Sequence, residues 1–139
     1  MPELRIGDRW IGDGHPPLVI AEVGINHEGD VAKALRMVHD AYDAGAECVK
    51  FQCHVIDDEM IPNAVVPGNA TESIWAIMSR CALGEAEECS LKARVESQGM
   101  LYLSTPFSRA ACATHASRTR CCTAPPCIRH PTTRFVWGL

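Results

Sequence analysis

The sequence has no apolar run near the roughly 18 residues that a membrane-spanning helix needs. The first residues also lack the apolar segment of a secretory signal peptide, so a cytoplasmic location is expected. The formal net charge is −4, and no basic stripe occurs before residue 112. These absences argue against a membrane or a nucleic acid as partner.

Acidic residues are missing from one part of the chain only. Residues 112–139 contain no Asp, Glu or Lys, but they contain four Arg and four Cys, and no helical or strand period is visible in them. We therefore divide the chain into residues 1–111 and an atypical tail, 112–139, which we expect to be poorly ordered. A reading-frame change near Cys112 is the leading explanation for the shift in composition.

The tail permits one alternative of a different class, a small metal-binding or interaction module. Its Cys and His residues are numerous enough to bind zinc, although their spacing matches no common zinc finger. These residues are Cys112, His115, Cys121, Cys122, Cys127 and His130. The four earlier cysteines, in apolar settings, are expected to be reduced core residues: Cys48, Cys53, Cys81 and Cys89.

The remaining 111 residues alternate between strand and helix patterns. Strands are predicted near 18–23, 48–52 and 100–104, and helices over 31–44, from a Thr71 cap to Cys81, and over 85–98. A hairpin is predicted over 4–14, and 53–70 reads as a long irregular loop. This order predicts an α/β fold with a parallel sheet.

Each predicted strand ends in polar residues. Glu22 ends the first strand, Lys50 and Gln52 lie on one face of the second, and Thr105 ends the third. Polar residues at the carboxyl ends of successive parallel strands are typical of a barrel with its active site at that rim. An inward-facing lysine needs an anion, so Lys50 predicts a phosphate or carboxylate ligand.

Structural roles remain open for the same residues. Glu22 and Lys50 could form an ion pair that only supports the fold, and Gln52 could be a satisfied core amide. His27 and His54, each taken alone, are better interpreted as surface histidines.

Four ordered motifs resemble the sialic acid synthase family, most closely its bacterial type. They are IAEVGINHEGD at 20–30, VKFQ at 49–52, VPGNA at 66–70 and STPFS at 104–108, and MSRCAL at 78–83 also agrees. The resemblance covers residues 3–111. It implies the N-terminal portion of a TIM-type (β/α)8 barrel, with an antifreeze-like domain and a homodimer in the full-length family.

The resemblance also implies a reaction. The family condenses phosphoenolpyruvate with N-acetylmannosamine and water to give N-acetylneuraminate and phosphate, using Mn²⁺ or Mg²⁺. By similarity, Lys50 and Thr105 would bind phosphoenolpyruvate, and Gln52 and Asn69 would contact the amino sugar. Glu22 would be catalytic, positioning a proton or water beside the reacting carbons.

The sequence differs from the family in how much of the barrel it covers. A closed barrel takes about 250 residues, whereas about three strand–helix units are legible here, and the family's metal ligands lie beyond this chain. The chain alone is therefore expected to be an incomplete and inactive fragment. A related nonulosonate, such as legionaminate, remains an alternative product.

Overall fold

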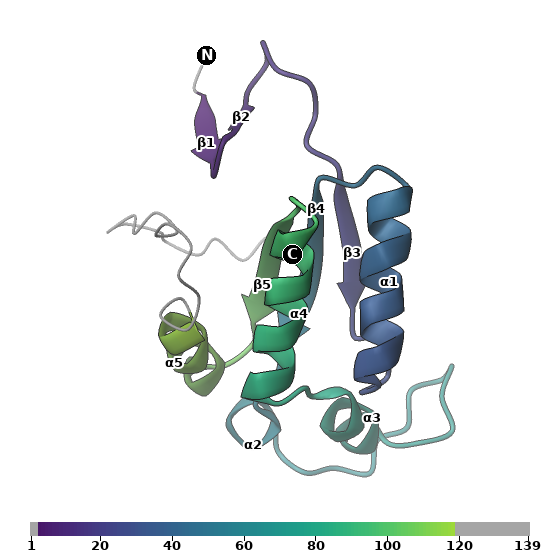
Figure 1. Ribbon diagram of the computed structural model, residues 1–139. Helices are drawn as coiled ribbons and strands as arrows, with labels where there is room; N and C mark the ends of the chain where they lie inside the picture. The colour runs from purple at the N-terminus through teal and green to yellow at the C-terminus, as the bar shows by residue number, and fades with distance from the viewer. Residues whose placement is uncertain (1–2, 119–139) are drawn as a thin grey trace.

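A parallel three-stranded sheet forms the centre of the computed structural model, which describes residues 3–118 (Figure 1). The strand order is β3-β4-β5, and the strands are β3 Ile20–Gly24, β4 Cys48–Cys53 and β5 Leu101–Pro106. These agree with the three predicted strands to within two residues. The α/β class and the parallel sheet are thus confirmed for this part of the chain.

Helices α1 (Val31–Asp43) and α4 (Glu85–Ser97) pack against the sheet and against each other (Figure 1). Their apolar residues meet alternate residues of β4 in one core, because successive side chains of a strand point to opposite faces. The centre of this core is fully buried and comprises Val38, Val49, Phe51, Leu91 and Val95. Lys50 and Gln52, on the opposite face of β4, are only partly buried.

A hairpin of β1 (Leu4–Ile6) and β2 (Arg9–Ile11) lies near the amino-terminal end of the sheet (Figure 1). Arg9 joins it to the start of β4 through a 2.6 Å ion pair with Glu47. Glu47 in turn accepts a backbone hydrogen bond from Leu101 at the start of β5. The hairpin is therefore tied to two strands of the sheet.

Helix starts follow the expected capping chemistry with one correction. Asp30 caps α1, its side chain accepting from the backbone N–H of Lys33 at 3.1 Å, as its position predicts. Helix α3 (Ile74–Cys81) begins at Ser73, whose hydroxyl accepts from Ala76 N–H at 3.2 Å. The prediction of Thr71 as this cap was wrong, because Ser73 stands directly before the first helical residue.

Two short elements were missed. Helix α2 (Ile56–Glu59) interrupts the stretch 53–70 that was predicted to be irregular, and its Ile56 is buried. Helix α5 (Arg109–Arg118) continues beyond Ala111, so the statement that no helical pattern survives there was wrong for residues 112–118. Asp58 links the two helices by accepting from Ala110 N–H at 2.8 Å, a contact that sequence periodicity does not reveal.

The core cysteines behave as predicted. Cys48, Cys53 and Cys81 are buried, Cys89 is half-buried, and none of these four forms a disulfide. Burial raises the pKa of the Cys48 thiol to about 11. Within residues 3–118 no helix has the length and apolar character needed to cross a membrane. The predictions for 119–139, including most of the proposed zinc ligands, lie outside the described residues.

Candidate functional site

The register of the sheet brings four predicted site residues to one face near its carboxyl end. Glu22 of β3 pairs in register with Lys50 of β4, and Gln52 pairs with Thr105 of β5. Residues in register on parallel strands share a face, and Lys50 and Gln52 are two positions apart. Glu22, Lys50, Gln52 and Thr105 therefore lie on one face of the sheet, and these four residues are here called the rim.

Glu22 and Lys50 form an ion pair across β3 and β4. The Lys50 Nζ–Glu22 Oε2 distance is 2.5 Å, and the side chains are 33% and 48% exposed. An exposed pair of this kind contributes at most about 1 kcal/mol to stability. The pair joins the two groups predicted for catalysis and anion binding, and it leaves both accessible from solvent.

A β-bulge follows Glu22 and shapes the rim. Glu22 pairs with Lys50, but Gly24 already pairs with Phe51, so β3 holds an extra residue at this point. Gly24 has a φ of +56°, and a Cβ there would lie 3.4 Å from Glu22 Oε1 and 3.5 Å from Gln52 Nε2. Bulges of this kind redirect neighbouring side chains and are frequent beside active sites. Gly24 thus lets the Glu22 carboxylate and the Gln52 amide approach each other.

A buried histidine stands behind Gln52. His54 Nδ1 lies 2.7 Å from Glu59 Oε2, and His54 Nε2 lies 3.2 Å from Gln52 Oε1. The His54 side chain is 2% exposed, and its ring stacks on Phe107 at a centroid distance of 4.6 Å. Its interpretation as a surface histidine was wrong, because α2 folds back over the end of β4. Continuing the strand alternation from Lys50 and Gln52 to His54 would have indicated its place.

His27 is also buried, with 1% exposed, so its surface interpretation was wrong as well. Its Nδ1 accepts a hydrogen bond from Gly29 N–H at 3.1 Å, and its ring packs against Phe51. Burial, and then the charge of Lys33, lowers the pKa of His27. A neutral His27 therefore holds the loop after β3 onto the core.

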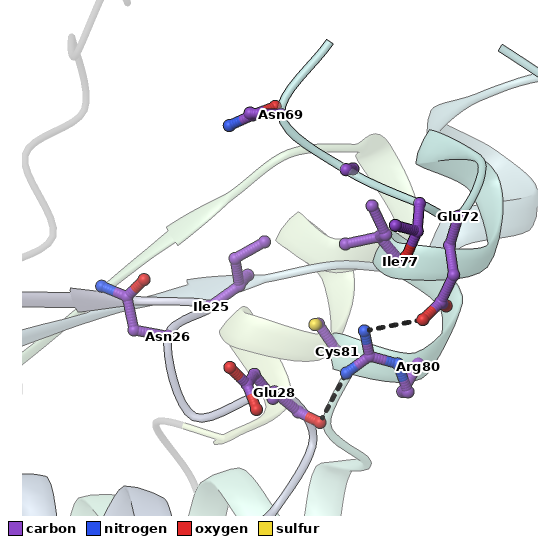
Figure 2. Close-up of a pocket in the computed structure, with 10 residues that line it drawn as sticks. Ile25, Asn26, Glu28, Asn69, Glu72, Ile77, Arg80 and Cys81 are labelled. Carbon is purple, nitrogen blue, oxygen red and sulfur yellow. Dashed lines mark hydrogen bonds and ion pairs between the residues drawn. The ribbon is translucent and has the colours of Figure 1, made fainter. Parts of the chain in front are cut away.

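Asn69, the remaining predicted site residue, lies on a different segment from the other four. It lines a cavity of about 360 Å³ together with Ile25 and Asn26 of the loop after β3 and residues of α3 (Figure 2). Arg80 on the α3 side approaches Glu72 at 3.8 Å and donates to the Glu28 carbonyl at 3.4 Å. Ile25 and Asn26, which follow Gly24 in the chain, line this cavity together with Asn69, so the loop after β3 connects the cavity to the rim.

A metal site does not emerge from the described residues. Within 3–118 no three His, Cys, Asp or Glu side chains are grouped so that they could hold a metal ion. The Mn²⁺ or Mg²⁺ expected from the resemblance therefore finds no fitting ligand set in this part of the chain, and we derive no chemical step through it.

Known proteins resemble the chain in sequence and in structure. The NeuB family model matches residues 37–120. The N-acetylneuraminic acid (sialic acid) synthetase of Leptospira borgpetersenii, crystallised with citrate, superposes with a TM-score of 0.71 at 30% identity over 84% of this chain. Mouse N-acetylneuraminate-9-phosphate synthase is 52% identical over 44 residues, 32% of this chain. The N,N'-diacetyllegionaminic acid synthase of Legionella pneumophila is 33% identical over 95 residues, 64% of this chain.

These relatives are longer proteins. The matches cover 38% of the Leptospira chain, 12% of the mouse enzyme and 27% of the Legionella enzyme. The family model, however, covers more than half of the present chain, and the structural match includes most of its described part. The chain accordingly belongs to the NeuB family of sialic acid synthase-like enzymes.

Proposed function

We propose that the rim binds phosphoenolpyruvate in a synthase that condenses it with N-acetylmannosamine and water to give N-acetylneuraminate and phosphate. One observation carries the proposal: an accessible lysine, paired with one carboxylate, lies on the same face of a parallel sheet as Gln52 and Thr105, which stand near the carboxyl end of that sheet. Ligands of parallel α/β folds bind at that end.

Lys50 would bind the anionic substrate. An ammonium group has three N–H donors, and in the described residues Lys50 Nζ makes one hydrogen bond, to Glu22. Two donors remain for a phosphate or carboxylate oxygen. Thr105, on the adjacent strand of the same face, would add a hydroxyl donor.

The amino sugar would lie between the rim and the Asn69 cavity. Gln52 supplies an amide at the rim, and Asn69 supplies a second one in a cavity that starts one residue after Gly24. Sugars are recognised by side chains that donate and accept hydrogen bonds, and both amides do so. This arrangement would present the sugar carbonyl carbon to C3 of phosphoenolpyruvate.

Glu22 would act beside the reacting carbons. Its carboxylate is within reach of Lys50, so it would lie close to the bound phosphoenolpyruvate. A carboxylate there can orient the attacking water or hold a proton as the C–C bond forms and phosphate leaves.

The fold and assembly of the whole protein belong to the proposal too. The β3-β4-β5 sheet with α1 and α4 on one face fits the first units of a (β/α)8 barrel, whose interior the rim would face. We propose a homodimer for the complete enzyme. A legionaminate-type product is the second candidate, favoured by the Legionella relative.

The test is phosphoenolpyruvate binding to the 139-residue chain, measured by calorimetry. Lys50→Ala should weaken binding at least tenfold, about 1.4 kcal/mol, because it removes a charge-assisted hydrogen bond. Lys92→Ala is the control, since Lys92 also pairs with a glutamate, Glu96, but on helix α4. Equal affinity in the wild type and Lys50→Ala would refute the proposed site.

A further inference from the structure

The segments that follow β4 and β5 are joined to each other at the carboxyl end of the sheet. Phe107 N–H donates to the Cys53 carbonyl at 3.1 Å, and the Phe107 ring stacks on His54 at a centroid distance of 4.6 Å. Asp58 of α2 accepts from Ala110 N–H of α5 at 2.8 Å. The turn between β5 and α5 is therefore held by the segment that carries α2.

The Asp58 carboxylate binds several groups at the start of α5. The bond from Ala110 N–H, and then those from the Ser108 hydroxyl and Arg109 N–H, lower the pKa of Asp58. The Ser108 hydroxyl also accepts from Ala111 N–H at 3.1 Å. The first N–H groups of a helix have no partner within the helix, and a negative charge beside them is stabilised. One carboxylate from α2 thus fixes the place where α5 begins.

The side chain of Thr105 depends on that turn for its orientation. Within residues 3–118 its hydroxyl makes no hydrogen bond that would hold it in place. The χ1 rotamer of a side chain depends on the backbone φ and ψ angles, so the backbone decides where this hydroxyl lies. The β-ladder fixes Thr105 beside Gln52, but the next residue, Pro106, has no N–H with which to secure the end of the strand. The contacts of the turn after β5 must secure it instead.

We propose that Asp58 is a positioning residue: by holding the turn after β5, it keeps the Thr105 hydroxyl at the rim, where that hydroxyl can donate to an anionic oxygen of phosphoenolpyruvate. Asp58 acts through Thr105 and makes no contact with the substrate itself. The contribution to phosphoenolpyruvate binding rests on the proposed function, whereas the effect of Asp58 on the orientation of Thr105 does not. The two parts are therefore tested separately.

The orientation of Thr105 is measured without any ligand. Three-bond coupling constants of Thr105 in the labelled 139-residue chain report its χ1 angle, and the wild type should show a single rotamer. Asp58→Ala frees the turn after β5, so the couplings should average over several rotamers. Asp57→Ala is the matched control, because Asp57 is an exposed carboxylate of the same helix whose side chain makes no hydrogen bond within the described residues. A single Thr105 rotamer in Asp58→Ala would overturn the proposal.

A double-mutant cycle on phosphoenolpyruvate affinity, measured by calorimetry, tests whether Asp58 acts through Thr105. Thr105→Val removes the hydroxyl and should weaken binding about tenfold, and Asp58→Ala should weaken it about fivefold. Because both changes remove the same interaction, the double variant should bind no more weakly than Thr105→Val alone. A general structural loss would lower the affinity in both backgrounds, so a loss of about fiftyfold in the double variant would overturn the proposal. Asp57→Ala, which removes the same charge, should leave the affinity unchanged.

A second variant covers the case in which Asp58→Ala does not fold. Asp58→Asn keeps an acceptor for Ala110 N–H, and its affinity should lie between those of the wild type and Asp58→Ala. Tighter binding in Asp58→Asn or Asp58→Ala than in Asp57→Ala would show that Asp58 blocks an anion site at the start of α5, and would overturn the proposal. Failure of the proposed function would look different: the wild type would not bind phosphoenolpyruvate, and the Thr105 couplings alone would then decide whether Asp58 positions this side chain.

Discussion

The two ends of the sheet carry ion pairs of nearly equal length but different surroundings. At the amino-terminal end, Arg9 binds Glu47 at 2.6 Å and also donates to the carbonyls of Trp10 and Pro16. At the carboxyl end, Lys50 binds Glu22 at 2.5 Å and, within the described residues, makes no further hydrogen bond. The Arg9 guanidinium donates to several groups of the chain itself, whereas the Lys50 ammonium keeps N–H donors that could bind a ligand. Length alone thus does not separate a structural ion pair from a binding group.

The largest effect is expected at the carboxyl end, from Gly29→Ala. Gly29 has a φ of +81°, and a Cβ there would lie 2.1 Å from the Arg80 carbonyl oxygen. The loop after β3 would have to leave α3, which should lower the free energy of unfolding by about 2–3 kcal/mol in urea titrations. Gly45→Ala is the control, because Gly45 has the same φ but open space around it. It should cost only about 1 kcal/mol, and equal losses would contradict the packing role.

The two cations should separate stability from binding. Arg9→Ala should lower the urea midpoint more than Lys50→Ala does, because Arg9 joins the hairpin to the sheet through several hydrogen bonds. Lys50→Ala should instead lower phosphoenolpyruvate affinity, which Arg9→Ala should leave unchanged. If Lys50→Ala destabilises the fold as strongly as Arg9→Ala, the Glu22–Lys50 pair is structural after all.

Acid should loosen the two ends at different pH values. Burial lowers the pKa of His27 in the folded chain. As the pH drops below about 6.5, His27 is therefore protonated in the unfolded chain before it is protonated in the folded chain, and the stability of the carboxyl end of the sheet falls. The bond from Arg9 lowers the pKa of Glu47, so its contribution is present above about 4.5 and is lost only below that value.

Amide exchange at each end, corrected for the intrinsic effect of pH, measures this order. Protection over 24–30 should fall before protection over 4–11. His27→Asn should remove the loss near pH 6, whereas His39→Gln, at an exposed position of α1, should not. Simultaneous loss of protection at both ends in the wild type would argue against this assignment.

The smallest expected effect concerns thiol chemistry. Burial raises the pKa of Cys48 to about 11, so little thiolate forms at pH 8, and Cys112 is exposed. Iodoacetamide should therefore alkylate Cys112 well before Cys48, as followed by peptide mass spectrometry. Early alkylation of Cys48 would mean that the amino-terminal end opens more readily than the structure indicates.

The sequence predicted the elements that depend on local patterns. The apolar run of β3, the mixed polarity of β4 with Lys50 and Gln52 two positions apart, and the Asp30 cap are properties of neighbouring residues, and all appear in the structure. The rim followed because parallel strands align their carboxyl ends. The functional roles of its residues stay predictions.

What sequence reasoning missed depends on contacts between distant residues. His54 is buried only because the one-turn helix α2 returns Glu59 to it, and a helix of that length leaves no periodic signal. His27 is buried because its loop packs against α3, through Gly29 and the Arg80 carbonyl. Tertiary packing decides side-chain burial of this kind. Residue type alone therefore led to the prediction that both histidines lie on the surface, although both are buried.

The contacts of Glu47 with Arg9 and with Leu101 have a consequence for the order of folding. Its side chain binds Arg9 at a separation of 38 residues, and its backbone carbonyl accepts from Leu101, much later in the chain. Contacts between distant residues form slowly, because the intervening loop must first be closed. On a ribosome, the hairpin can dock as soon as β4 emerges, whereas the edge of β4 waits unpaired until β5 has been made. Chaperone dependence and misassembly should therefore concentrate in that interval of synthesis.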